Sequence, residues 1–300
     1  MIYRVRHSTR YAYRSTVELA AHLLHLRPRA LPGQRVISAE ITAAPAASRR
    51  RDALDHFGNH VTWLFLDEPH GSFEVVGEAV VEVGFPAPPP AGASLAWEAV
   101  ADLARAGGPA AWQAAEFTFD SPMVPVEPAA GAYAAPSFPV GRPVLEGLLE
   151  LNLRIRREFA YRPGATDLAT PVAEVLERRQ GVCQDFSHVM ISALRALGLP
   201  ARYVSGYIRT LPPAGTPPGT PRRRGVDQSH AWVGCWLGPE HGWVDLDPTN
   251  GVVVREEHLV VGWGRDYADV SPVSGVVLGG GDHSLAIAVD LDPVALEAAG

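Results

Sequence analysis

Lysine is missing from this sequence, since all 26 basic residues of the 300-residue chain are arginine. A protein of this composition has no side-chain ε-amine through which it could be crosslinked to another copy of itself. Cysteine is also scarce, with only Cys183 and Cys235 present. Two cysteines in a chain of this length without a secretory signal are usually reduced, so no disulfide is expected.

Long apolar runs are absent too, and none approaches the roughly 20 residues that a membrane-spanning helix needs. The N-terminal segment MIYRVRHSTRYAYRS alternates like a β-strand and lacks the apolar centre of a signal peptide. These absences predict a cytoplasmic protein without a membrane partner. A net charge of −7, with the arginine run at residues 222–224 confined to one loop, argues against a nucleic-acid partner.

Common cofactor motifs are lacking as well: the sequence has no Gly-x-Ser-x-Gly elbow, no phosphate-binding loop and no dinucleotide fingerprint. His56 and His60 have the spacing of a helical metal pair, but Gly58 and Asn59 predict a turn between them. We therefore predict neither a cofactor nor a metal.

Changes in composition and in hydrophobic spacing along the chain predict its domain organisation. With 47% hydrophobic residues, a chain of this length can form two domains with cores of their own. Residues 1–84 contain several alternating runs and predict a small β-sandwich, although the stretch AAHLLHL around His22 and His25 has helical spacing. Residues 85–139 contain PAPPPAGASL at residues 86–95 and then become alanine-rich, which predicts a linker with a helical segment. A second domain is predicted to begin at about residue 140.

The most informative segment is GVCQDFSHVMISALRALGLP, which predicts a helix with a cysteine in its first turn. Gly198 and Pro200 end this helix. Its apolar residues recur at helical spacing: Phe186, Val189, Met190, Ala193, Leu194 and Leu197. Because unpaired N–H groups and the positive end of the helix dipole favour an anion, Cys183 is placed where a thiolate is stabilised. A thiolate is a nucleophile.

A later segment, SHAWVGCWLGPEHGWVDLDPTN, supplies a base and a carboxylate. Two alternating runs around a Gly-Pro turn predict a β-hairpin. His230 opens the first strand, while Asp245 and Asp247 end the second, so the imidazole and a carboxylate can meet across the hairpin. The two aspartates have the same parity along the strand, and this reasoning does not separate them.

These residues carry a family resemblance. GVCQDF, SHAWV and GWVDLDPTN resemble the three catalytic blocks of the transglutaminase-like superfamily. The segments IYRVRHSTRYAYRSTVELAAHLLHLRPR and GRDYADVSPVSGVVLGGGDHSLAIAVDLDP resemble bacterial transglutaminase-like cysteine proteases with a small β-domain before the core. The resemblance covers nearly the whole chain except about residues 85–139.

The resemblance implies a fold class and domain boundaries. The expected fold is α+β: a papain-like core, with the nucleophile helix packed on an antiparallel sheet, follows a small β-sandwich. The catalytic core is expected over residues 140–292, with a C-terminal tail at residues 293–300.

The resemblance also implies a Cys-His-Asp triad. Cys183 is the expected nucleophile, His230 the general base and acid, and Asp247, in the Asp-Pro-Thr block, the residue that orients the imidazole. Gln180 and Gln184 are two open choices for a donor that joins the Cys183 N–H in binding an oxyanion.

The neighbours of the triad have simpler expected roles. Asp185 is predicted to cap or charge the first turn of the nucleophile helix, with a supporting role in catalysis as the alternative. Asp245 is the alternative orienting carboxylate. Cys235 is separated from His230 by an odd number of residues, so we expect it on the opposite face of the strand, in the core.

The predicted activity is thiol-dependent acyl transfer at an amide bond of a peptide or protein. Water as acceptor makes the enzyme a cysteine peptidase or amidase, which is the favoured outcome, and an amine makes it a transglutaminase. A binding or assembly module with a relict triad is the alternative from another class. The proline- and glycine-rich segment 211–228, which leads into His230, is expected to be a surface loop at the rim of the cleft or a lid.

Overall fold

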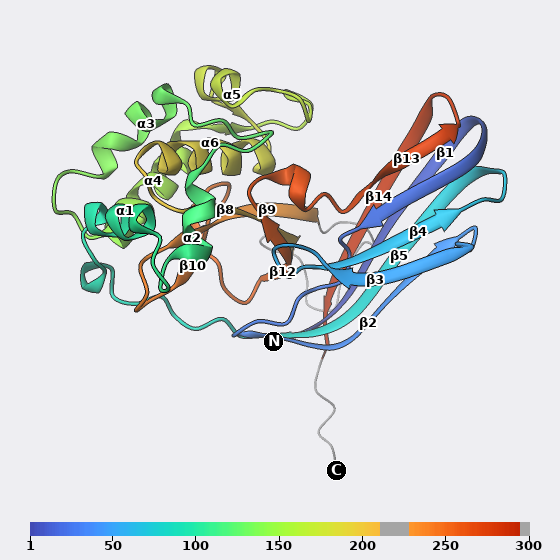
Figure 1. The fold of residues 1–300 in the computed structure, drawn as a ribbon, viewed down its shortest axis with the longest axis horizontal. Helices are drawn as coiled ribbons and strands as arrows, with labels where there is room; N and C mark the ends of the chain where they lie inside the picture. The colour runs from blue at the N-terminus through green and yellow to red at the C-terminus, as the bar shows by residue number, and fades with distance from the viewer. Residues whose placement is uncertain (211–227, 295–300) are drawn as a thin grey trace, which may run out of the picture.

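A computed structural model describes residues 1–210 and 228–294 of the chain, which form two lobes (Figure 1). We call them the β-lobe, which holds both ends of the described chain, and the mixed lobe, which holds the helices. Most of the segment predicted as a rim loop, residues 211–227, lies outside the described residues. No helix in the described ranges has both the length and the apolar composition needed to cross a membrane.

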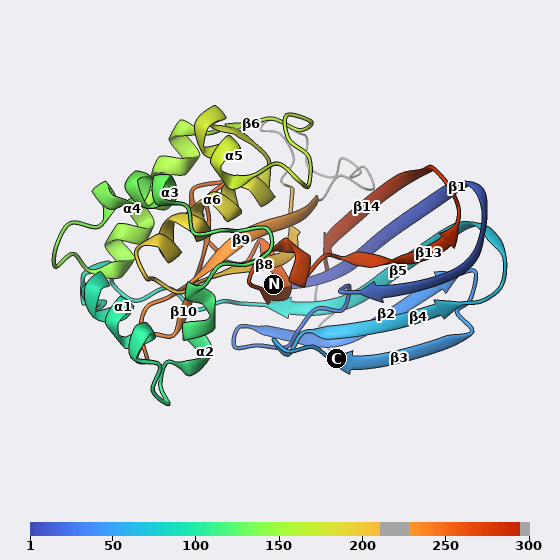
Figure 2. The same ribbon diagram turned by 45° about the horizontal axis from the view of Figure 1, so that its top comes forward.

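The β-lobe is one seven-stranded antiparallel sheet that folds into two packed layers (Figure 2). Its central strand, β1, turns back on itself near residues 14–16, so that its two halves lie in different layers. Apolar side chains from both layers fill the space between them, among them Val17 and Leu64 from one layer and Phe73 from the other. The first five strands are β1 (Ile2–Leu24), β2 (Gln34–Ala44), β3 (Arg49–Leu54), β4 (His60–Leu66) and β5 (His70–Val83).

The end of the chain completes this sheet. Strands β13 (Val273–Gly279) and β14 (His283–Pro293) both pair with β1, in register over Tyr3↔Pro293 through Tyr13↔His283 for β14. The predicted boundary of the catalytic core at residue 292 is therefore displaced, because residues 273–293 belong to the β-lobe. A long central strand offers two edges, and β13 and β14 pair one after the other with the edge that β4 and β5 leave open.

The stretch AAHLLHL is part of a strand, so its helical spacing was misleading. Ala20, His22 and Leu24 are buried at a spacing of two residues, and this half of β1 is paired on both edges. The ring of His22 stacks on Phe73 with 4.1 Å between centroids. His25 lies 3.5 Å from the carboxylate of Asp55. Both histidines therefore serve packing and pairing within the β-lobe.

Residues 85–139 are more than a linker. They form the short helices α1 (Trp97–Ala106), α2 (Trp112–Ala115) and α3 (Pro128–Ala134), joined by 3₁₀ turns. The predicted continuous helical segment is broken at Gly107, which adopts a left-handed conformation with φ of 66°. Val100, Phe117 and Phe138 are buried in the main core of the mixed lobe, so this segment covers that core.

The mixed lobe packs helices against a five-stranded antiparallel sheet with the order β11-β10-β9-β8-β12. Helix α6 (Cys183–Ala196) lies on this sheet, and its buried residues Phe186, Met190 and Leu194 share one core with Ala231 and Val233 of the sheet. The other elements are α4 (Val144–Glu158), β6 (Ala160–Tyr161), α5 (Val172–Arg178), β7 (Gln180–Gly181), β8 (Ala201–Ile208), β9 (Gln228–Trp236), β10 (Trp243–Asp247), β11 (Val252–Val253) and β12 (His258–Gly264). This arrangement confirms the predicted α+β fold and brings the start of α6 to the sheet.

Candidate active site

Cys183 is the first residue of α6 and is half-buried. The preceding turn is held by Asp185, whose carboxylate accepts hydrogen bonds from the Val182 N–H and the Thr166 hydroxyl, both at 2.7 Å. Gly181 must be small here, since a Cβ at this position would lie 2.4 Å from the Asp185 carboxylate. Asp185 therefore fixes the start of the helix, as predicted, and the Cys183 N–H stays within the unpaired first turn.

His230 and Asp247 meet across the β9–β10 hairpin. The imidazole Nε2 donates to Asp247 Oδ2 at 2.7 Å, and both side chains are buried. This hydrogen bond leaves Nδ1 of the ring available to Cys183, whose thiol is close enough to be one of the causes that raise the pKa of His230. The three residue types named from the sequence thus come together in the order Cys183, His230, Asp247, although they lie on three separate elements.

The electrostatics of the pair keep both side chains charged. Burial alone would lower the pKa of His230, but hydrogen bonds and charges from Asp247 and Cys183 outweigh burial and raise the pKa to about 10. Burial alone would raise the pKa of Asp247, but hydrogen bonds from His230 and His258 hold it well below its usual range. His230 is therefore favoured as an imidazolium at neutral pH, and this is the form that can donate a proton to a leaving group.

Asp247 is held by more than His230, and these further contacts were not predicted. His258, at the start of β12, donates from Nε2 to Asp247 Oδ2 at 3.0 Å. The backbone N–H groups of Thr249 and Asn250 donate to Oδ1 at 2.9 and 3.1 Å, and the Asn250 amide donates to Oδ2 at 2.6 Å. The Asp-Pro-Thr-Asn turn is a sequence signal for the backbone donors, because aspartate commonly accepts from residues two and three positions later. Nothing local to His258 indicates its contact.

His230, Asp247 and His258 also form the type of cluster that can bind a metal ion, with ligand atoms within 4.8 Å of one another. Two imidazoles and a carboxylate suit a zinc ion in chemical type. The two Nε2 atoms, however, lie at hydrogen-bonding distance from the same carboxylate oxygen. Hydrogen bonding therefore accounts for the cluster as it stands.

Asp245 lies apart from the triad. Its carboxylate accepts from the indole N–H of Trp232 at 3.0 Å and lies 3.7 Å from the guanidinium of Arg202. The structure thus separates two aspartates that strand parity left equivalent, and only Asp247 contacts His230.

The remaining predicted residues fall into two groups. Gln180 and Gln184 flank Cys183 in the sequence. Gln180, in β7, accepts a hydrogen bond from Arg162 at 3.4 Å, and Gln184 is half-buried in the first turn of α6. Cys235 is fully buried and free, and burial raises the pKa of its thiol far above the ordinary value. Cys183 and Cys235 are not joined by a disulfide.

Two family matches cover most of the chain. Residues 3–82 match the family described as the bacterial transglutaminase-like N-terminal region, and residues 138–248 match the transglutaminase-like superfamily. These regions hold the first five strands of the β-lobe and all three residues of the candidate triad. The resemblance inferred from the sequence blocks is therefore confirmed.

Individual relatives agree with these matches. An uncharacterized protein of Mycobacterium tuberculosis is 40% identical over 98% of this chain and 93% of the relative. A crystal structure from Cytophaga hutchinsonii, described as a candidate cysteine protease, has a TM-score of 0.73 over 97% of this chain and 90% of its own, at 20% identity, and so supports the fold. A protein-glutamine gamma-glutamyltransferase of Pseudomonas aeruginosa is 40% identical over 30% of this chain and 13% of the relative. This chain belongs to the transglutaminase-like superfamily, in the bacterial group that carries the transglutaminase-like N-terminal region.

Proposed function

We propose that this protein is a thiol-dependent enzyme that hydrolyses an amide bond of a peptide or protein substrate. The observation that supports this proposal best is the buried imidazole of His230, held by Asp247 through Nε2 at 2.7 Å, with the Cys183 thiol near enough to raise its pKa. A buried cysteine that only packed would need neither a base nor a buried carboxylate beside it.

The proposed reaction has two stages. The Cys183 thiol gives its proton to His230, the sulfur attacks the amide carbon, and the imidazolium passes this proton to the leaving amine, which leaves a thioester. Water then attacks the thioester and gives a proton to His230, which releases the acid and leaves Cys183 as a thiolate beside the imidazolium, in equilibrium with the starting thiol and neutral imidazole. Asp247 holds the imidazole in orientation throughout.

The tetrahedral oxyanion of each stage needs hydrogen-bond donors. The Cys183 N–H, in the unpaired first turn of α6, is the proposed first donor. The side-chain amide of Gln180 or Gln184 is the proposed second donor, and the sequence and the geometry leave the two equivalent.

We expect hydrolysis to exceed transamidation when both acceptors are present. Cys183 is half-buried, and a thioester on this sulfur stays open to water, whereas transamidation needs a site that excludes water and admits an amine. To measure this, a glutamine-containing peptide library is incubated with the enzyme and an excess of a primary amine. Cleavage, deamidation and amine incorporation are then followed by mass spectrometry. Because the enzyme lacks lysine, it adds no competing side-chain ε-amine.

Cys183→Ala is the matched control for this experiment, since every product that depends on the thiol should vanish with it. Predominant amine incorporation would contradict hydrolysis and favour the transglutaminase alternative, which the similarity to the Pseudomonas gamma-glutamyltransferase also favours. No product, together with a Cys183 thiol as resistant to iodoacetamide as a buried thiol such as Cys235 is expected to be, would indicate a binding module.

His258 is expected to act as a positioning residue for Asp247. Its Nε2 donates to the carboxylate, while its Nδ1 is buried without a partner among the described residues. Loss of one hydrogen bond to a charged group costs about 1.5–3 kcal/mol. We therefore expect His258→Phe to lower kcat by roughly ten- to a hundred-fold with little change in KM.

His258→Gln is the control for this prediction, because a glutamine amide reaches the position of Nε2 and restores a donor to Asp247. We expect it to recover most of kcat. If His258→Phe keeps its activity while His258→Gln loses it, packing of the ring against Trp232, at 5.3 Å, is the role of His258 instead.

A further inference from the structure

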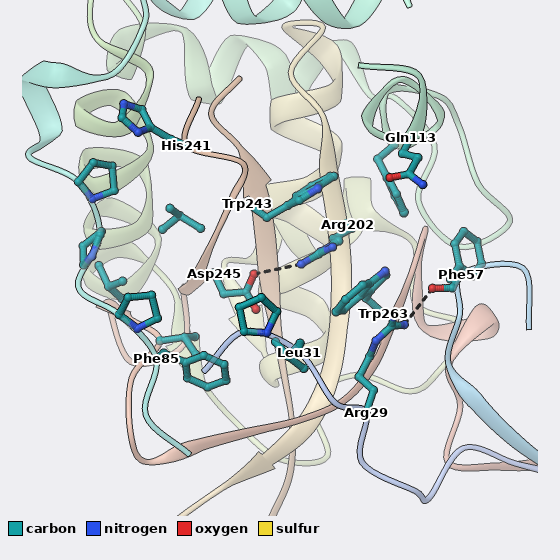
Figure 3. A pocket seen from close by; sticks show the side chains of 18 of the residues that line it. Arg29, Leu31, Phe57, Phe85, Gln113, Arg202, His241, Trp243, Asp245 and Trp263 are labelled. Carbon is teal, nitrogen blue, oxygen red and sulfur yellow. Dashed lines mark hydrogen bonds and ion pairs between the residues drawn. The ribbon is translucent and has the colours of Figure 1, made fainter. Parts of the chain in front are cut away.

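A cavity of about 820 Å³ lies between the two lobes (Figure 3). Arg29 and Phe57 of the β-lobe line it on one side, Arg202 and Trp243 of the mixed lobe line it on another, and the proline-rich segment 85–89 closes it. Its size falls in the range of about 300–1,000 Å³ that is typical of small-molecule sites. None of Cys183, His230 and Asp247 lines this cavity, so it is separate from the candidate active site.

An alternating stack of arginine and tryptophan side chains forms one wall. The guanidinium of Arg202 lies 4.3 Å from the ring centre of Trp243 and 3.8 Å from that of Trp263, between the two rings. Arg29 lies 3.4 Å from the centre of Trp263, on its other face (Figure 3). The stack fixes two cationic groups a short distance apart at the edge of the cavity.

A glycine in the sheet leaves space for the Arg202 side chain to lie against the strands. Arg202 on β8 and Asp245 on β10 both pair with Gly234 on β9, and their side chains meet above it. A Cβ on Gly234 would lie 2.6 Å from Arg202 Nε and 2.9 Å from the Asp245 carboxylate. Only glycine therefore leaves space for this pair at the floor of the cavity.

The positive charge of this wall is incompletely balanced. Asp245 lies 3.7 Å from Arg202 but also accepts from Trp232, and Glu116 at the rim pairs with His56 at 2.8 Å. Within residues 1–210 and 228–294, Arg29 has no carboxylate oxygen at ion-pair distance and donates to the neutral oxygens of Phe57 and Asn59.

The hydrogen bonding of both arginines is incomplete as well. Arg202 is only 7% exposed, and its Nε and that of Arg29 are buried without partners among the described residues. Burial is the largest cause that lowers the pKa of each guanidinium to about 10. The charges of Asp55 at Arg29 and of Asp245 at Arg202 oppose this shift in part, and the charge of Arg29 adds to it at Arg202. An anion at this wall would relieve the repulsion and supply an acceptor.

Aromatic rings and prolines make up much of the remaining lining, beside polar side chains such as Gln113 and His241. Phe57, Phe117 and Trp243 contact one another in sequence, with ring centres 5.8 and 5.4 Å apart, and prolines face them. Trp112 at the rim is 62% exposed, a large apolar surface that the protein itself leaves uncovered.

We propose that this cavity is a binding site for an organic anion with a flat apolar body. The anionic group would lie at the guanidinium edges of Arg29 and Arg202, and the body would lie between the aromatic side chains and the prolines. The site does not depend on the proposed thiol chemistry, and its test needs no substrate.

The test uses anilinonaphthalene sulfonate, an aromatic anion whose fluorescence rises in apolar surroundings, with phenylnaphthylamine as a neutral probe of similar shape. We expect saturable binding of one sulfonate per chain, with energy transfer from tryptophan. The neutral probe should bind about ten-fold more weakly or worse, as expected when a charge-assisted hydrogen bond is lost. Arg29→Gln and Arg202→Gln should each weaken sulfonate binding to a similar degree, and the exposed Arg10→Gln should not.

Each variant is checked by circular dichroism and thermal unfolding before its affinity is compared. Equal affinity for the charged and neutral probes on the unmodified protein would overturn the proposal, whether or not the arginine variants fold. Weak binding without saturation, or equal sulfonate affinity in the folded Arg29→Gln, Arg10→Gln and unmodified proteins, would overturn it as well.

Discussion

Replacing Cys183 with alanine is expected to abolish turnover and leave the fold intact. The side chain supplies the proposed nucleophile, and removal of a nucleophile from a catalytic triad typically costs roughly 10⁶ in kcat. The fold should tolerate the change, because a methyl group fits a half-buried first-turn position. The hydrogen bond from Ser187 to the Cys183 carbonyl, at 2.8 Å, does not involve the thiol. The measurement is steady-state hydrolysis of a peptide amide, beside the thermal unfolding temperature of both proteins.

Cys235→Ala is the matched control, since the chain has only these two cysteines. It removes a buried thiol from the core and should lower stability while kcat stays close to that of the unmodified enzyme. His230→Ala should approach the loss in Cys183→Ala, and the double variant should be little worse than either, because residues that act as one unit are not additive. Activity near that of the unmodified protein in Cys183→Ala would remove this residue from the mechanism.

The elements that carry the triad were predictable because their signals are local. Apolar spacing and the Gly198 stop were enough to predict helix α6, and two alternating runs around a turn predicted the β9–β10 hairpin. Both elements form with the expected bounds to within a few residues. The position of Cys183 at the helix start follows from the same local pattern.

Contacts between distant segments could not be predicted in this way. The pairing of β14 with β1 joins residues about as far apart as the chain allows, and neither strand encodes its partner in its own periodicity. His258 contacts Asp247 although β8 and β9 lie between β12 and β10 in the sheet, and no pattern near His258 in the sequence encodes this contact. AAHLLHL fits both helical and strand spacing, and pairing on two edges decided in favour of the strand.

The choice between Asp245 and Asp247 shows where local reasoning ends. Both lie on one face of β10, so parity predicts the same direction for each. What differs is the residue opposite: Asp245 pairs with Gly234 and meets Arg202 there, whereas Asp247 lies at the strand end beside His230. From the sequence, Asp247 was preferred because Pro248 ends the strand there and because the family motif centres on it.

Asp247→Asn is expected to lower kcat by roughly 10⁴, the cost of the corresponding change in a Ser-His-Asp triad. The amide has one favourable orientation, because the fixed backbone N–H groups of Thr249 and Asn250 need the oxygen at the Oδ1 position. The amide NH₂ then replaces Oδ2 and faces His230 Nε2, which must become an acceptor. The imidazole is thereby forced to carry its proton on Nδ1, and a neutral ring of this tautomer cannot accept the thiol proton.

The pH dependence separates this tautomer effect from a loss of stability. With the carboxylate gone, a main cause of the raised His230 pKa is removed, so the pKa should fall from about 10 and the imidazolium should be lost at lower pH. The alkaline limb of the kcat profile of Asp247→Asn should therefore move to lower pH. Asp245→Asn is the matched control: it removes a carboxylate from the same strand, should leave the limb in place, and should cost little in kcat. A larger loss in Asp245→Asn than in Asp247→Asn would make Asp245 the orienting residue, against the 2.7 Å contact between His230 and Asp247.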